Sequence, residues 1–157
     1  MSVVGIVGGD ARLFFEIARR VGLTGRATAL AQDEQTATAI GDAAIADGIT
    51  LDVASPYLPL TVPDGSIDLV MVDEQTARPA SFALPALLPH VRTALRPGGR
   101  LVIVLPAGGI LARWLGRTPS PDVRPVIEVC LAAGLSKGRL LAAYGGLAFV
   151  EALRPNV

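Results

Sequence analysis

The 157 residues are enough for one domain with a layered core and too few for a separate substrate-binding domain. The formal net charge is zero and arginines are spread over all segments, which argues against nucleic acid as the main partner. No apolar stretch approaches the roughly 20 residues that span a bilayer. No signal peptide precedes the first apolar run, and the single cysteine, Cys130, excludes an internal disulfide. We therefore expect a single cytoplasmic domain, residues 1–157, with no membrane partner.

Short apolar runs alternate with segments of helical periodicity along the chain, a pattern that is typical of a parallel sheet covered by helices. The first run closes at two glycines, and Gly22 ends the first periodic segment. In chain order the predicted elements are strand 3–7, helix 13–21, strand 26–31, helix 33–47, strand 49–53, strand 67–72, helix 81–95, strand 101–105, helix 126–133 and a hairpin of strands 139–143 and 147–153.

Prolines and glycines mark the connections between these elements. Pro56, Pro59 and Pro63 exclude a regular element between the third and fourth strands, so a loop is predicted there. A second proline-rich stretch, residues 119–125, predicts an irregular link before the last helix. Gly145 and Gly146 can turn the final hairpin.

Two stretches in the middle of the chain carry a family resemblance. Residues 64–72 read Asp-Gly-Ser-Ile-Asp-Leu-Val-Met-Val, and residues 92–104 read Arg-Thr-Ala-Leu-Arg-Pro-Gly-Gly-Arg-Leu-Val-Ile-Val. Pro97 cannot continue a helix, and Gly98 and Gly99 can supply the positive φ of a sharp reversal. The pattern resembles class I S-adenosylmethionine (SAM)-dependent methyltransferases. The resemblance implies an α/β, Rossmann-like fold: a seven-stranded, mostly parallel sheet of order 3-2-1-4-5-7-6 with helices on both faces.

The first loop fits this family poorly. On the family pattern Asp/Glu-x-Gly-x-Gly-x-Gly, the acidic position falls on Gly5, and only Gly9 of the three glycine positions is in register. Gly8 and Gly9 still allow a close backbone approach to a ligand. The resemblance therefore makes Gly8, Gly9 and Asp10 candidate cofactor-binding residues, in a loop without the acid that helps hold the methionine part of SAM.

The resemblance also implies acids after the second and third strands. The ribose position, usually Asp or Glu, falls on Ala31, so Asp33 or Glu34 would have to present a carboxylate from a shifted loop. The alternative is that these two residues cap the next helix. The adenine position falls on Asp52 and Val53, where Asp52 would accept from the adenine amino group and Val53 would pack on the ring.

Candidate chemistry on the substrate side is sparse. Asp73, after the fourth strand, would face the transferred methyl and is a weak catalytic candidate. Its spacing from Asp68 matches a metal-dependent subgroup, but the further oxygen ligands are missing after the next strand, so no metal is predicted. His90 is predicted to be a solvated helix residue, and Cys130 a buried small hydrophobe.

Three interpretations of the function remain open. The first is a methyltransferase with a small-molecule acceptor and SAM as cofactor; the second is a catalytically inactive binding or scaffold subunit with a protein partner. The third, a nicotinamide-dinucleotide domain, ranks last because residues 5–10 lack the GxGxxG spacing. Trp114, in the apolar segment after the fifth strand, suggests a pocket wall or a homodimer contact.

Overall fold

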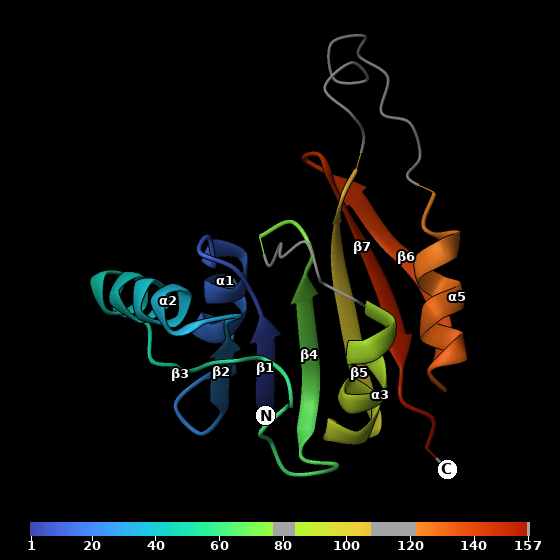
Figure 1. Cartoon of the computed structure of the whole chain (residues 1–157), viewed down its shortest axis with the longest axis horizontal. Coiled ribbons are helices and arrows are strands. Elements are labelled where there is room, and N and C mark those ends of the chain that lie inside the picture. The colour runs from blue at the N-terminus through green and yellow to red at the C-terminus, as the bar shows by residue number, and fades with distance from the viewer. Residues whose placement is uncertain (77–83, 108–121, 157) are drawn as a thin grey trace, which may run out of the picture.

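The protein forms a seven-stranded sheet of order β3-β2-β1-β4-β5-β7-β6 (Figure 1). The computed structural model describes residues 1–76, 84–107 and 122–156. The strands are β1 Ser2–Ile6, β2 Arg26–Leu30, β3 Asp52–Ala54, β4 Ile67–Asp73, β5 Leu95–Pro106, β6 Ser136–Tyr144 and β7 Leu147–Leu153. The helices are α1 Arg12–Val21, α2 Glu34–Ala46, α3 Leu84–Ala94 and α5 Arg124–Ala132. The predicted strand order is confirmed, including the position of β4 beside β1.

The register of the strands defines the edge of the sheet at which a site can form. β1 pairs in parallel with β2 and β4, β2 with β3, and β4 with β5, whereas β7 runs antiparallel to β5. Ile6 lies level with Leu30 and Val72, and Leu30 lies level with Ala54. The carboxyl ends of β1 to β4 therefore meet at one edge, the usual place for ligands in such sheets.

Two apolar cores lie on the two faces of the sheet, because side chains alternate along each strand. On one face α1 and α2 pack over β1 and β2, with Phe14 and Ile40 fully buried. On the other face α3 and α5 cover β4, β5 and β7, with Leu88 and Cys130 fully buried. Figure 1 shows the first helix pair beside the β1–β3 half of the sheet and the second pair beside the other half.

The connection from β3 to β4 contains no helix, as the three prolines predict. Residues 55–66 form turns and bends only. Partly buried Tyr57, Leu58, Leu60 and Val62 of this loop pack against the same core as α3. The loop thereby adds apolar side chains to the core on the α3 face of the sheet.

The structure corrects several predicted boundaries. Ile49 is not in a strand: its N–H donates to the Ala44 carbonyl (2.8 Å) and closes the end of α2, so β3 begins only at Asp52. β5 begins at Leu95, and only Gly98 of the glycine pair has positive φ (72°). Pro125 lies inside the first turn of α5, where its missing N–H costs nothing.

β6 begins at Ser136, three residues before its predicted start. The remaining elements lie within two residues of their predicted bounds, except that the start of the third predicted helix falls outside the described residues. The hairpin turn at Gly145 and Gly146 is confirmed, with φ of 61° and 79°. Among the described residues, no helix is long and apolar enough to cross a membrane.

Candidate functional site

The loop after β1 is tied down on both sides. The Val7 N–H donates to the Leu30 carbonyl (3.1 Å), and the buried Gly8 N–H donates to the Thr76 hydroxyl (3.1 Å) in the turn after β4. Gly9 is exposed, and a Cβ at this position would meet no atom within 4 Å. The loop is therefore fixed at Gly8 and open at Gly9, where a ligand can approach the backbone.

The acid that Gly5 lacks cannot be accommodated in this fold. Phe14 is fully buried, and its ring lies directly over Gly5. A Cβ on Gly5 would lie 2.5 Å from Phe14 Cδ2, inside any normal contact distance. Helix α1 thus packs on β1 through the space that an acidic side chain would need, and the departure from the family pattern is built into the core.

The end of β2 is apolar as well. Ala31 is fully buried in the α1–α2 core, and its N–H donates to the Ala54 carbonyl (2.9 Å). Asp33 is the N-cap of α2: its Oδ1 accepts from the Thr36 N–H (2.7 Å), and that bond lowers the pKa of the carboxyl. The capping alternative for Asp33 is therefore the one the geometry supports.

Glu34 differs from Asp33, because its carboxylate reaches sideways to the next strand. The Ser55 hydroxyl, just after β3, donates to Glu34 Oε2 (3.1 Å). These two side chains place hydroxyl and carboxylate oxygens at the carboxyl ends of β2 and β3.

Asp52 and Val53 do not follow the third strand; they begin it. Asp52 lies level with Thr28, two residues before the strand end, and its Oδ2 is 3.5 Å from Arg26 Nε. It lines a cavity of about 320 Å³ that also touches Ser2 and Ile67, the starts of β1 and β4. Val53 packs against the α1–α2 core. The prediction that both residues lie at the carboxyl end of the third strand is wrong, because β3 starts three residues later than the apolar pattern suggests.

Asp73 is the last residue of β4 and is 2% exposed. Its Oδ1 accepts from the N–H groups of Gln75 (3.0 Å) and Thr76 (3.3 Å) in the following turn. Burial raises the pKa of this carboxyl above its ordinary value, although the hydrogen bonds from Thr76 and Gln75 act in the opposite direction. Asp68, at the other end of β4, is a structural residue that accepts from Ser2 N–H (2.7 Å) and Arg96 Nε (2.6 Å).

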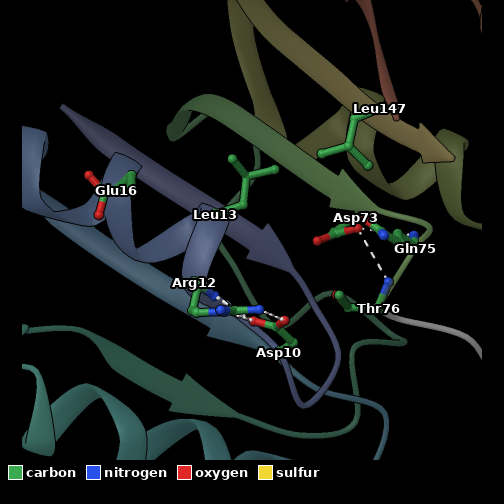
Figure 2. A pocket seen from close by; sticks show the side chains of 8 residues that line it. All are labelled: Asp10, Arg12, Leu13, Glu16, Asp73, Gln75, Thr76 and Leu147. Atoms are coloured by element: carbon green, nitrogen blue, oxygen red, sulfur yellow. Dashed lines mark hydrogen bonds and ion pairs between the residues drawn. The ribbon is translucent and has the colours of Figure 1, made fainter. Parts of the chain in front are cut away.

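Asp73 lines a cavity of about 530 Å³ at the carboxyl edge of the sheet. Helix α1 and the residues before it form one wall, the turn after β4 forms another, and the start of β7 contributes one leucine. Figure 2 shows the lining side chains, which are Asp10, Arg12, Leu13, Glu16, Asp73, Gln75, Thr76 and Leu147. The structure therefore brings two of the predicted residues, Asp10 and Asp73, to one hollow beside the Gly8–Gly9 loop, and leaves Asp52 elsewhere.

The sequence analysis missed the other six lining residues, which are Arg12, Leu13, Glu16, Gln75, Thr76 and Leu147. Thr76 had a signal, because an Asp followed three residues later by Thr is typical of a side-chain-capped turn. For Leu13 the sequence showed only that the residue belongs to the apolar face of a helix. Leu147 gave no signal, since it reaches the cavity from the far end of the sequence through the antiparallel β7.

The remaining candidates lie away from this cavity or outside the described residues. His90 is exposed on α3, as predicted. Cys130 is fully buried on α5, and burial raises the pKa of its thiol to about 11, which keeps the thiol protonated. Trp114 lies outside the described residues. Among the described residues, no group of three or more His, Cys, Asp or Glu side chains could hold a metal ion.

Comparison with solved structures shows the same fold in methyltransferases. A SAM-dependent methyltransferase from Aquifex aeolicus superposes with a TM-score of 0.73 at 17% identity, over 98% of this chain and 82% of the other. One from Methanosarcina mazei gives 0.68 and 15%, covering 98% and 92%. The SAM-dependent methyltransferase SibL gives 0.73 and 18% over 98% of this chain, which spans half of SibL's length.

Sequence comparison adds no closer relative: no family model matches the chain. Nor does any curated protein sequence match it. The likeness rests on three-dimensional structure, and its conclusion concerns the fold: the chain has the class I SAM-dependent methyltransferase fold.

Proposed function

We propose that this protein is a SAM-dependent methyltransferase domain that acts on a small-molecule acceptor. The observation that carries the proposal is the cavity of about 530 Å³ at the carboxyl ends of β1 and β4, with Asp73 in its wall. It lies at the edge where open α/β sheets bind ligands, and it is large enough for a small molecule. The shared fold with SAM-dependent methyltransferases supports the same assignment.

The residues present fit one end of SAM better than the other. Beside the cavity, Asp10, Asp73 and the open backbone at Gly9 can contact the methionine end. At the nucleoside end, Glu34 and Ser55 are the polar side chains at the strand ends, in place of an acid at Ala31. SAM would bring an activated methyl group, so the protein would need mainly to position the acceptor.

Asp73 is the residue of this chain that we assign to the acceptor. Its Oδ1 is held by two backbone N–H groups, which fix the orientation of the carboxylate. Burial raises the pKa of this carboxyl, which makes the group a better proton acceptor than an exposed aspartate. In this proposal Asp73 orients the acceptor and takes its proton at Oδ2.

The second candidate function is a catalytically inactive binding or scaffold subunit. The observation in its favour is that both acids of the family pattern are excluded by packing as well as missing. The Phe14 ring occupies the space over Gly5, and Ala31 lies in the core. A chain that needed these acids for cofactor binding would not fill their space with apolar side chains. In this case the partner would be a protein, including a second copy of the chain.

Calorimetric titration of the purified protein with SAM and with S-adenosylhomocysteine distinguishes the two candidate functions. The methyltransferase proposal expects both to bind, and the Asp73→Asn variant to lose transfer of a radiolabelled methyl group. Asp52→Asn is the matched control, since it also removes one carboxylate but at the opposite end of a strand. Absence of binding at millimolar ligand would refute the enzyme and leave the scaffold.

A further inference from the structure

The cavity of about 320 Å³ lies on the other face of the sheet from the candidate active site. Its floor is formed by β2 and β3 with the first residues of β1 and β4, and residues 61–66 form its roof. The connections from β1 to β2 and from β2 to β3 each contain a helix, whereas the one from β3 to β4 contains turns and bends only. Figure 1 shows this connection crossing the sheet on the side of α3. The cavity therefore remains where the connection lacks the bulk of a helix.

The lining of this cavity changes from charged to apolar along β2. Arg26, Thr28 and Leu30 point to the same face of the sheet, because side chains alternate along a strand. Arg26 is exposed at the mouth, Thr28 is partly buried, and Leu30 is 1% exposed. Ile67, which is 4% exposed, and Ala54 complete the apolar inner end. A ligand that fills the cavity therefore needs an aliphatic group at its inner end.

The charges at the mouth neutralise each other. Arg26 and Asp52 are the charged residues of the lining, and Arg26 Nε lies 3.5 Å from Asp52 Oδ2. Their side chains are 76% and 68% exposed, so water solvates both. The cavity thus offers no counter-ion to a charged ligand, which would lose its own hydration on entry and meet a mouth residue of like charge.

Hydroxyl groups form the polar part of the interior. Thr28 lines the floor on β2, and Thr61 lines the roof. Within the described part of the chain, neither threonine hydroxyl is hydrogen-bonded to another residue. The Ser66 hydroxyl donates to the Pro63 carbonyl (2.6 Å), which leaves the Ser66 oxygen as an acceptor. Because a hydroxyl both donates and accepts, this lining suits a ligand with a hydroxyl or an amide group.

We propose that this cavity binds an uncharged small molecule that joins a branched aliphatic body to one hydroxyl or amide group. The body packs on Leu30 and Ile67, and the polar group bonds to the Thr28 and Thr61 hydroxyls. The cavity is large enough, since ligand sites begin at about 300 Å³. Asp73 lies on the other face of the sheet, so this site is separate from the proposed methyl-transfer site and does not rest on the proposed function.

The test is an NMR titration of the ¹⁵N-labelled protein with three probes that share one carbon skeleton: 3-methyl-1-butanol, 3-methylbutylammonium and 3-methylbutanoate. We expect the alcohol to shift the amide signals of Thr28, Ala54 and Ile67 in a saturable way. The two ions should bind at least about tenfold more weakly, because neither finds a counter-ion. An ion that binds as tightly as the alcohol, or alcohol shifts that do not saturate, would overturn the proposal.

Thr28→Val removes the hydroxyl and keeps the bulk, and valine is well accepted in strands. The affinity for 3-methyl-1-butanol should fall about three- to tenfold, the effect of one neutral hydrogen bond. Thr24→Val, in the exposed turn after α1, is the matched control and should leave the affinity unchanged. Unchanged affinity in Thr28→Val would show that this hydroxyl bonds only to water and would overturn the proposal.

Two further measurements locate the bound alcohol. Ala54→Leu fills the inner end of the cavity and should abolish binding, with thermal melts to confirm that the variant is folded. Saturating S-adenosylhomocysteine should leave the affinity for the alcohol unchanged. Full binding in a folded Ala54→Leu protein, or displacement of the alcohol by S-adenosylhomocysteine, would overturn the separate site.

Discussion

The two sides of the crevice use their carboxylates in different ways. On the β2–β3 side, Asp33 caps α2 and Asp52 pairs with Arg26 at the far end of its strand, while Ala31 is apolar. On the β4 side, Asp73 is buried beside a cavity and forms no ion pair with the residues that the structure describes. Asp33 and Asp52 on the β2–β3 side are thus bonded within the fold, whereas Asp73 on the β4 side lines a cavity.

The difference shows that an acid near a strand end is not by itself a ligand-binding acid. In an N-cap aspartate, one carboxylate oxygen accepts a hydrogen bond from a backbone N–H, and the side chain stays exposed to solvent. The carboxylate of an exposed ion pair is stabilised by water and by its partner, so it needs no ligand. A buried, unpaired carboxylate destabilises the protein unless something binds it, which is a common mark of a functional site.

The largest expected effect comes from placing an acid at Gly5, which tests whether the space between β1 and α1 is closed by packing. We expect Gly5→Asp to lower the free energy of unfolding by more than about 4 kcal/mol, because the new side chain clashes with Phe14 and buries a charge. Chemical denaturation followed by circular dichroism measures this, with Gly9→Asp, at an open position, as control. A stable Gly5→Asp protein that binds SAM more tightly would mean that Phe14 moves aside.

Ala31→Asp asks the same question at the ribose position. A side chain there is fully buried in the α1–α2 core, so we expect a loss of about 3–5 kcal/mol for an unpaired buried charge and no gain in SAM affinity. Ala31→Ser, which adds a hydroxyl without a charge, is the milder control. If Ala31→Asp folds normally and tightens SAM binding tenfold, the ribose site is intact and only its acid has been lost.

Asp73→Asn should stabilise the protein at neutral pH. The pKa of Asp73 is raised in the folded state, so the folded protein binds more protons than the unfolded chain, and stability falls as the pH rises from about 4. Asparagine cannot ionise, so the variant should melt a few degrees higher than the wild type at pH 7. For a chain of this size, each kcal/mol of unfolding free energy raises the melting temperature by about 2–4 °C.

This advantage of Asp73→Asn should vanish below about pH 4. Thermal melts of the two proteins between pH 3 and pH 8 check it, and Glu74, whose pKa is also raised by burial, is present in both and cancels. A variant less stable than the wild type at pH 7 would show that the hydrogen bonds in the turn outweigh the cost of the buried charge.

Asp52→Ala is expected to have the smallest effect. Both partners of its ion pair are mostly exposed, and such pairs contribute within about 0.5 kcal/mol. Because Asp52 begins β3, we expect SAM affinity to change less than twofold. A several-fold loss of affinity in calorimetry, with an unchanged melting temperature, would restore Asp52 to the adenine site.

The sequence by itself determined the fold. The apolar runs at β1 and β4, the Pro97–Gly98 stop after α3 and the Gly145–Gly146 turn are local signals, and each sets the direction of the chain through its own backbone restrictions. The strand order then follows from the family resemblance and the short range of connections allowed between buried strands. The sequence also placed Asp73 at the end of β4, because that strand is bounded by a clear change in polarity.

Only the tertiary structure decided which of the candidate residues share a site. Whether Gly5 has room for an acid depends on the Phe14 ring, and whether Asp52 precedes or follows β3 depends on Ile49 closing α2 instead of starting a strand. The bond from Gly8 to Thr76 and the approach of Leu147 join segments 68 or more residues apart. Such contacts are set by how helices and strands pack, and packing depends on the shapes of distant side chains that no local pattern encodes.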